Sequence, residues 1–318
     1  MPLKEKSLIA RLRKRAPSGG AVITGIGDDA AVLRIPRSHQ ALVTTDFSLE
    51  GIHFRREWHP PEVIGHRSLT RGLSDIAAMG GQPIAAFLSL ALPPSLPQAW
   101  VDRFLNGLLK LAKTFKVSLA GGDTSESPAG VLIDIVVVGS VARGQAILRS
   151  AARAEDRIYV TGTLGGSAAA LSLLCSGRKL REGDFPQHFR PMPRIPVGRI
   201  LGRKAIPSAM IDLSDGLSSD LAHICSESGV GAEIETEAIP VARWGKPVTP
   251  VDPKFVLHGG EDYELLFTAP PGRRVPRRIA GIPITAIGHI RTKRGIFLMT
   301  QGKRVELTPQ GWQHFDRR

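Results

Sequence analysis

Hydrophobic and polar residues alternate with two different periods along the chain, and these periods predict helices and strands. Residues 97–116 carry apolar side chains at every third or fourth position, including Trp100, Phe104, Leu108 and Phe115, which predicts a helix. Similar spacing, or helix start and stop residues, predicts helices at residues 7–14, 61–79, 167–175, 197–204 and 216–228. Runs rich in β-branched residues predict strands at 21–24, 41–45, 84–92, 117–120, 131–141, 157–161, 232–235, 264–268 and 284–290. Strands occur in pairs and triples with helices between them, which favours an α+β fold built from layers.

A polar stretch at residues 143–156 has no hydrophobic period and separates the predicted elements into two groups. Two domains are also the number expected for 318 residues, because one domain typically spans about 100–200 residues. We therefore predict two α/β domains, at residues 1–148 and 149–318. Residues 177–195 are rich in Arg, Gly and Pro and are predicted to form a loop. The hydrophobic fraction of 42% is typical of a globular chain and excludes wholesale disorder.

The chain is strongly basic, with 42 Lys and Arg residues against 29 Asp and Glu residues and a net charge of +13. Most of the basic residues are Arg, and they are scattered. The densest runs, at residues 11–15 and 273–278, have no interleaved aromatic residues to stack on bases, and no Cys/His finger spacing occurs. This pattern favours a solvated basic surface, with a site for an anionic ligand as a second contributor. A nucleic-acid-binding protein stays open as an alternative.

Cysteine usage and hydropathy limit where the protein is expected to act. Cys175 and Cys225 are the two cysteines, so there is no disulfide framework and no CxxC motif. The N-terminal residues are too charged for a signal peptide, and no apolar run approaches the ~18 residues of a membrane span. We expect a cytoplasmic protein with no membrane partner.

Acidic residues in small-residue settings are the most informative feature of the sequence. Most of them follow strand-like runs, so we expect them at strand ends, whereas Asp75 falls on a predicted helix. Mg²⁺ prefers oxygen ligands and is usually held by a few carboxylates together with substrate phosphates. For any single Asp, a role as a turn residue or a helix cap is the better explanation. Together they indicate Mg²⁺-assisted phosphoryl transfer, and the segments are Gly25–Asp29, Thr44–Asp46, Leu73–Asp75, Gly121–Thr124 and Asp212–Gly216.

Four other features of the sequence can each be interpreted in two ways. The Gly162–Ser167 turn either binds a phosphate at a helix N-terminus or is a tight strand-to-helix turn. His53 either reaches the site of Asp46 or is structural, and Arg149 either meets a phosphate or belongs to the basic surface. Glu261 either binds a cationic substrate or caps a turn. The chain has neither a Rossmann fingerprint nor a P-loop.

Seven motifs along the whole chain, in order, resemble those of the thiamine-monophosphate kinase family. Gly-Gly-Asp or Ser-Asp-Gly alone would be weak, because the wider aminoimidazole ribonucleotide synthetase superfamily shares such pieces. The combination is specific, and the C-terminal segment Gly311–Phe315 also looks like that family. The motifs are Gly25–Ala30, Thr44–Asp46 with Glu50–Phe54, Leu73–Gly80, Gly121–Thr124, Tyr159–Thr163, Ile211–Leu217 and Gly259–Leu265.

The resemblance implies transfer of the ATP γ-phosphoryl group to thiamine monophosphate, with several Mg²⁺ ions. It implies two synthetase-like α/β domains, the first binding ATP and Mg²⁺, and a homodimer whose N-terminal sheets pair into a shared barrel. No side chain of the sequence is identified as a covalent nucleophile or strong base, so we expect direct in-line transfer between bound substrates. The implied metal ligands are Asp29, Thr44, Thr45, Asp46, Asp75, Asp123, Asp212 and Asp215. The implied ATP-binding residues are Gly122, Asp123, Arg149 and Ser214, and the implied substrate-binding residues are His53, Glu261 and Trp312.

Other members of the same superfamily are the main competing interpretation. A selenophosphate synthetase is expected to carry an N-terminal Cys, and a hydrogenase-maturation relative a C-terminal Cys, and neither feature is found here. An aminoimidazole ribonucleotide synthetase is opposed by the Glu50–Phe54 and C-terminal matches. We expect no nucleic-acid partner, although a basic nucleic-acid-binding protein remains the alternative from another class.

Overall fold

A computed structural model describes residues 5–16, 19–27, 29–245, 247–312 and 315 of the chain. The fold divides into two compact units. The N-terminal unit comprises Met1–Ile76 and Gly81–Gly144, and the C-terminal unit comprises Ala77–Gly80 and Gln145–Arg318. In the part of the chain that is described, no helix is long and apolar enough to cross a membrane.

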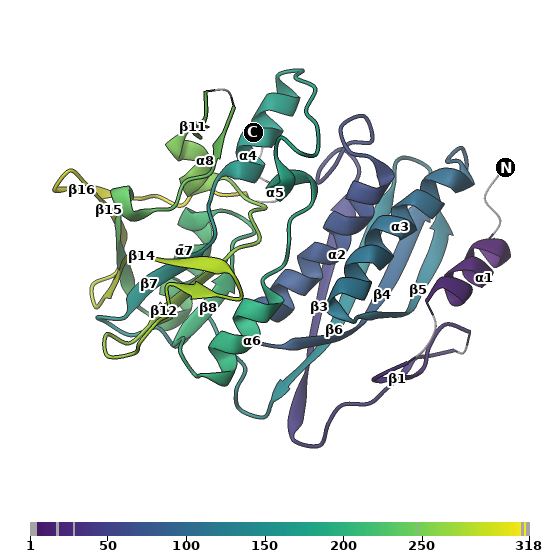
Figure 1. Ribbon diagram of the computed structural model, residues 1–318, viewed down its shortest axis with the longest axis horizontal. Helices are drawn as coiled ribbons and strands as arrows, with labels where there is room; N and C mark the ends of the chain where they lie inside the picture. The colour runs from purple at the N-terminus through teal and green to yellow at the C-terminus, as the bar shows by residue number, and fades with distance from the viewer. Residues whose placement is uncertain (1–4, 17–18, 28, 246, 313–314, 316–318) are drawn as a thin grey trace. The chain divides into compact units, whose positions relative to one another are not determined.

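The N-terminal unit is built on a four-stranded sheet in the order β3-β6-β4-β5. Its strands are β3 (His39–Leu49), β4 (Gln82–Leu92), β5 (Ser118–Glu126) and β6 (Leu132–Ala142). β4 and β5 are parallel, so the chain must cross over between them, and helix α3 (Gln98–Phe115) makes this connection. Helix α2 (Pro61–Ala78) joins β3 to β4, and Figure 1 shows α2 and α3 side by side along the sheet.

Two glycines allow α2 and α3 to pack with their backbones in contact. A Cβ atom at Gly107 would lie 1.9 Å from the carbonyl oxygen of Glu62, and one at Gly65 would lie 2.1 Å from that of Phe104. Leu73 and Leu108, on the same two helices, are fully buried. The helices therefore form one rigid layer that carries the residues of α2.

A shorter helix and a small hairpin complete the N-terminal unit. Helix α1 (Glu5–Arg15) is tied to α3 by an ion pair between Arg11 and Asp102 at 2.8 Å. Strand β1 (Val22–Thr24) pairs with β2 (Val32–Leu33), and the turn between them carries Asp29. The four-stranded sheet is open, with β3 and β5 at its edges, so the described residues of one chain contain no closed barrel.

The C-terminal unit is built on an eight-stranded sheet with the path β16-β15-β9-β14-β7-β12-β8 and β13 paired to β14. Figure 1 shows β7, β8, β12 and β14 near one another, and β8 is an edge strand of this sheet. Its strands are β7 (Arg157–Thr161), β8 (Ala209–Asp212), β9 (Gly231–Glu235), β12 (Leu265–Ala269), β13 (Arg278–Ile279), β14 (Ile282–Arg291), β15 (Ile296–Thr300) and β16 (Lys303–Glu306). Its other elements are α4 (Gly166–Cys175), α5 (Pro186–Phe189), α6 (Ile195–Arg203), α7 (Leu217–Ser228), α8 (Pro253–His258), the 3₁₀ helix Thr236–Ala238 and the strand pair β10 (Arg243–Trp244) with β11 (Thr249–Pro250).

Most predicted elements are confirmed, and the exceptions have local causes. The helices expected at 61–79 and 97–116 correspond to α2 and α3 within one residue at each end. The loop expected at 177–195 is wrong in part, because Pro186 begins the four-residue helix α5. The strand expected to end at residue 120 continues to Glu126, because parallel pairing with β4 extends it.

Candidate functional site

A cavity of about 500 Å³ lies in the N-terminal unit, between the β1–β2 turn and strands β4 and β5. Its size falls in the range of about 300–1,000 Å³ that is typical of small-molecule sites. Asp29, Gly122 and Asp123, three of the predicted site residues, line this cavity together. Ile9 and Leu12 of α1 supply apolar lining. The structure therefore unites acidic, glycine-rich and apolar surface at one place.

The floor of the cavity requires glycine at position 122. Gly122 has φ of +146°, and a Cβ atom there would lie 1.8 Å from the carbonyl oxygen of Leu88 on β4. The next residue, Asp123, lies inside β5 and accepts a hydrogen bond from the Thr124 N–H at 2.8 Å. The expectation that Asp123 ends a strand is wrong, and its backbone is fixed by the parallel ladder.

A second group of predicted residues lies where β3 faces α2. Thr44 donates a hydrogen bond to Asp75 Oδ2, so the motif on the strand meets the motif on the helix. Asp46 is two residues further along β3, on the same face as Thr44 because side chains alternate along a strand. Asp46 therefore lies inside a strand rather than at its end. Its Oδ1 is 3.8 Å from the Nε of Arg71, which α2 also carries.

Thr45 points to the opposite face of the sheet. Its hydroxyl donates a hydrogen bond to Asp134 Oδ1 on β6 at 2.8 Å, whereas the neighbouring residues Thr44 and Asp46 face α2. The structure does not bring the Thr45 hydroxyl to the carboxylates of Asp46 and Asp75. The alternation of side chains along β3 separates it from the other two residues of the motif.

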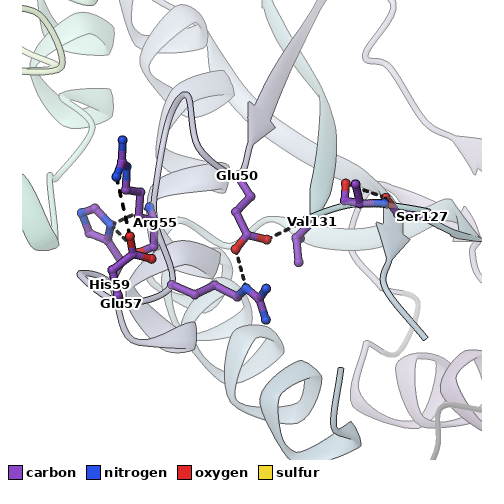
Figure 2. A network of polar contacts seen from close by, with 8 residues as sticks. Glu50, Arg55, Glu57, His59, Ser127 and Val131 are labelled. Carbon is purple, nitrogen blue, oxygen red and sulfur yellow. Dashed lines mark hydrogen bonds and ion pairs between the residues drawn. The ribbon is translucent and has the colours of Figure 1, made fainter. Parts of the chain in front are cut away.

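The turn after β3, which carries His53, is held by a polar network. Figure 2 shows Glu50 directed toward Val131, whose N–H donates to Glu50 Oε2 at 2.9 Å. Glu50 Oε1 also accepts from Arg56 Nε at 2.5 Å. His53 Nδ1 accepts from the Leu49 N–H at 3.0 Å, so the imidazole ring is oriented by the last residue of β3.

In the C-terminal unit, Asp212 ends β8 and Asp215 lies in the bend before α7. They do not open a helical turn together, because Gly216, with φ of +117°, separates the bend from the helix. Asp220, in the first turn of α7, accepts hydrogen bonds from the N–H groups of Asp215 at 3.2 Å and Gly216 at 3.0 Å. Burial raises the pKa of Asp220 well above its usual range, and Asp212 and Asp215 raise it further. Three carboxyl groups therefore influence one another in this loop.

Glu261 lies directly against the loop that carries Ser214. Its N–H donates to the Ser214 carbonyl oxygen at 2.8 Å, and a Cβ atom at Gly260 would lie 2.4 Å from that oxygen. Glu261 has a positive φ of 63°, an uncommon conformation for a non-glycine residue. Ser214 and Glu261 are thus brought together by backbone hydrogen bonding.

The C-terminal segment contacts the loop of Ser214 and Asp215, whereas Arg149 is held by a different part of the unit. The Trp312 N–H donates to the Asp215 carbonyl oxygen at 3.1 Å, and the Trp312 side chain is exposed. Arg149 is exposed as well, and its carbonyl oxygen accepts from Ser228 Oγ at 2.9 Å. His314, part of the C-terminal motif, lies outside the described residues, as does Asp28 of the first motif.

The Gly162–Ser167 turn is bound by a protein carboxylate. Asp262 accepts hydrogen bonds from the N–H groups of Gly165 at 2.7 Å and Ser167 at 3.4 Å. These amides at the start of α4 are the ones that a phosphate would use, so the structure favours the tight-turn interpretation. Next to Asp262, Glu264 pairs with Arg194 and accepts from Thr161 Oγ1 at 2.5 Å.

Asp220 and Asp262 were missed in the sequence because nothing local separates a buried acid from a surface acid. Both carboxylates accept backbone N–H groups next to predicted site residues. Each follows a turn that contains glycine, Gly216 before Asp220 and Gly260 before Asp262, and that position was the available signal. Asp220 and Asp262 therefore fix the backbone of these two turns through hydrogen bonds.

The oxygen-bearing side chains can supply a few ligands to a hard cation, but they do not form a complete coordination shell. Among the described residues, no group of three or more His, Cys, Asp or Glu side chains is placed to hold a metal ion. Thr44 and Asp46 on one face of β3, together with Asp75 of α2, which is hydrogen-bonded to Thr44, provide oxygen donors only. Mg²⁺ typically takes one or two carboxylates and completes its shell with water and substrate phosphates, so this donor set fits it.

Comparison with known proteins assigns both halves of the chain to one class. Residues 27–141 match the AIR synthase related protein, N-terminal domain, and residues 153–299 match the AIR synthase related protein, C-terminal domain. The structure of the hydrogenase maturation protein HypE in complex with ATP has the same fold, with a TM-score of 0.78 at 18% identity. The chain thus has the two-domain α/β fold of the AIR synthase related proteins.

Closer relatives narrow this class to one family. The chain is 38% identical to the thiamine-monophosphate kinase of Salmonella typhimurium strain LT2 over 99% of both chains. It is 35% identical to that of Bacillus subtilis strain 168, over 98% of this chain and 100% of the relative. The chain belongs to the thiamine-monophosphate kinase family.

Solved structures of this family superpose on nearly the whole chain. The thiamine-monophosphate kinase from Stenotrophomonas maltophilia K279a has a TM-score of 0.82 at 34% identity, covering 96% of this chain and 99% of that one. AaThiL complexed with AMPPCP and TMP has a TM-score of 0.78 at 34% identity, covering 98% of this chain and 97% of that one.

Proposed function

We propose that this chain transfers the γ-phosphoryl group of ATP to the phosphate of thiamine monophosphate and releases thiamine diphosphate and ADP. Family membership over the full length supports this activity, and so does the structure of a relative complexed with AMPPCP, an ATP analogue, and TMP. The observation that carries the proposal in this chain is the cavity shared by Asp29, Gly122 and Asp123. That cavity belongs to the part proposed as the ATP- and Mg²⁺-binding domain, residues 1–148.

The cavity has the chemistry that an ATP site needs. Backbone amides next to Gly122 can approach phosphate oxygens because no side chain intervenes. Ile9 and Leu12 give an apolar wall suited to a purine ring. In the C-terminal unit, Ser214 and Arg149 are the further residues that we propose for contact with ATP, and the exposed Arg149 provides the positive charge.

The proposed Mg²⁺ ligands are carboxylates and one hydroxyl on both units. When bound, Mg²⁺ would neutralise phosphate charge and hold phosphate oxygens in a fixed arrangement. The Thr45 hydroxyl is not among the ligands that we propose, because it points to the face of Asp134. The proposed ligands are Asp29, Thr44, Asp46, Asp75, Asp123, Asp212 and Asp215.

Three residues are proposed to bind thiamine monophosphate. The Glu261 carboxylate suits the cationic thiazolium ring, and its backbone is fixed against Ser214. The Trp312 side chain is exposed and can stack on an aromatic ring. His53 stands on a turn whose geometry Glu50 fixes, and we propose that it lies near the substrate phosphate.

We propose that transfer is direct and in line, without a phosphoenzyme. The phosphate of thiamine monophosphate is already an anion at neutral pH, so attack on the γ-phosphorus needs no strong base. The protein then contributes orientation and charge neutralisation, which account for most of the catalysis of phosphoryl transfer.

We also propose a homodimer in which the N-terminal sheets pair, as the family resemblance implies. β3 is an edge strand, and its side chains Val43 and Phe47, on the face away from Asp46, are 68% and 56% exposed. Exposed apolar side chains on an edge strand are a typical site of association. Sedimentation velocity should give a mass near twice 34.2 kDa for the native chain, and Phe47→Asp should shift it toward the monomer.

The activity is tested with γ-labelled ATP, thiamine monophosphate and MgCl₂. Label should appear in thiamine diphosphate, and Asp46→Asn should lower the rate at least ~100-fold while leaving the circular dichroism spectrum unchanged. Asp184→Asn, an exposed residue in a turn of the C-terminal unit, is the matched control and should keep wild-type activity. Wild-type activity in folded Asp46→Asn would remove Asp46 from the proposed site. A labelled phosphoenzyme would instead contradict direct transfer.

A further inference from the structure

A positively charged side chain, that of Arg71, lies among the acidic residues of the N-terminal unit. Arg71 is on α2 one helical turn before Asp75, so both side chains project from the same side of the helix. Its Nε lies 3.8 Å from Asp46 Oδ1 on β3. The Arg71 side chain is 18% exposed and that of Asp46 is 26% exposed, so water screens this pair only in part.

An arginine at this position has an electrostatic consequence for the proposed Mg²⁺ ligands. The guanidinium is always charged, so it neutralises nearby carboxylates at every pH at which the protein is folded. The negative charge of Asp46 is therefore offset in part without a metal ion. A guanidinium and a divalent cation repel each other, and Mg²⁺ requires its oxygen ligands at 2.0–2.1 Å. The Arg71 guanidinium and Mg²⁺ therefore cannot both contact Asp46 Oδ1.

We propose that Arg71 is the resident counter-ion of Asp46 and that its guanidinium leaves Asp46 when a divalent cation binds there. The inference rests on the proposed function, because it takes Asp46 as a metal ligand. Arg71 is then a positioning residue. It keeps Asp46 ordered in the metal-free protein, and it lowers the intrinsic affinity of the site for metal. The long flexible stem of arginine lets the charged group move while the aliphatic part stays packed.

The proposal is tested by calorimetric titration of the metal-free protein with MnCl₂, without nucleotide or thiamine monophosphate. Mn²⁺ accepts the same carboxylate ligands as Mg²⁺. Arg71→Met keeps the apolar stem and removes the competing charge, so it should bind Mn²⁺ about fivefold more tightly than the wild type. Arg71→Lys keeps a cation and should stay near the wild-type affinity.

Arg103→Met is the matched control. Arg103 also projects from a helix of the N-terminal unit and binds a carboxylate, Glu62, with Nε–Oε1 at 2.7 Å and Nη2–Oε2 at 2.9 Å. This variant changes the net charge by the same amount as Arg71→Met. It should leave Mn²⁺ affinity unchanged, and equal tightening in both variants would show a general charge effect and contradict the proposal.

Asp46→Asn separates this inference from the proposed function. If Arg71 acts through Asp46, Arg71→Met should tighten Mn²⁺ binding in the wild-type background and have no effect in the Asp46→Asn background. Loss of binding in Asp46→Asn combined with no tightening in Arg71→Met would overturn the inference and leave Asp46 as a ligand. Unchanged binding in Asp46→Asn would overturn both. Absence of binding in wild type and Arg71→Met alike would also overturn the inference.

A stability measurement gives a second readout that does not depend on activity. Without metal, Arg71→Met removes the guanidinium charge next to the Asp46 carboxylate, so the midpoint of thermal unfolding of this variant should fall below that of the wild type. MnCl₂ should then raise the midpoint more in Arg71→Met than in the wild type, because metal binding replaces the missing cation. A similar metal-induced rise in both proteins would contradict the proposed exchange of cations.

Discussion

Replacing Asp262 by Asn should remove a pH dependence of stability that the buried carboxyl group causes. Burial, with smaller contributions from Glu264 and Glu261, raises the pKa of Asp262 to about 7, although hydrogen bonds from Gly165 and Ser167 oppose the rise. The unfolded chain has the ordinary value of about 3.8. Between these values the native protein holds a proton that the unfolded chain releases. The stability from Asp262 is therefore fully present below about pH 4 and is lost as the pH rises through about 7.

The size of the effect follows from the two pKa values. Where the native carboxyl is protonated and the unfolded one is ionised, stability falls by about 1.4 kcal/mol for each pH unit. The slope disappears above about pH 7, so the loss between pH 5 and pH 8 is about 3 kcal/mol. Asn has no titrating proton and retains an amide oxygen that accepts one of the two backbone N–H groups.

Urea unfolding of wild type and Asp262→Asn at pH 5, 6, 7 and 8, at constant ionic strength, measures this loss. The difference between the two proteins cancels the titration of other groups. The stability of wild type minus that of the variant should fall by about 3 kcal/mol across the series, mainly between pH 5 and pH 7. A difference that stays constant, or that rises with pH, would refute the reasoning.

Two further predictions concern close packing and thiol burial. Gly107→Ala should destabilise the N-terminal unit by about 1–3 kcal/mol in thermal unfolding, because the new Cβ would lie 1.9 Å from the Glu62 carbonyl oxygen. Gly183→Ala, with no atom within 4 Å of the new Cβ, is the control and should change stability little; equal effects would contradict the close contact between helices. Burial raises the pKa of the Cys225 thiol to about 12, whereas Cys175 is exposed. A thiol reagent should therefore label one cysteine quickly in the native protein and two after denaturation, and fast labelling of both would show that Cys225 is accessible.

Long amphipathic helices were the most predictable part of the fold. α2 and α3 each show apolar side chains at helical spacing over eighteen residues, so their bounds could be read closely from the sequence. Short elements were not predictable in the same way. β8 has four residues that are all buried, and a run of this length has no period to distinguish a strand from a loop. Its pairing with β12, far away in sequence, makes it a strand.

The motif residues of the site could be identified in the sequence, but the directions of their side chains and their neighbours depend on tertiary structure. The family resemblance implied that Thr44, Thr45 and Asp46 are all metal ligands. β3 continues past residue 46, so side-chain alternation places the Thr45 hydroxyl on the other face. Arg71 gave no signal either, since one arginine among thirty is not distinctive until α2 brings it within 3.8 Å of Asp46.

The central claim is that this chain phosphorylates thiamine monophosphate with ATP, using oxygen ligands that hold Mg²⁺. The most direct measurement is phosphorus NMR of the purified protein with ATP and thiamine monophosphate, before and after addition of MgCl₂. The account predicts that the diphosphate signals of thiamine diphosphate and ADP grow in equal amounts only after Mg²⁺ is added, and that chelation stops them. ADP formation with inorganic phosphate instead of thiamine diphosphate, or an equal rate without a divalent cation, would contradict it.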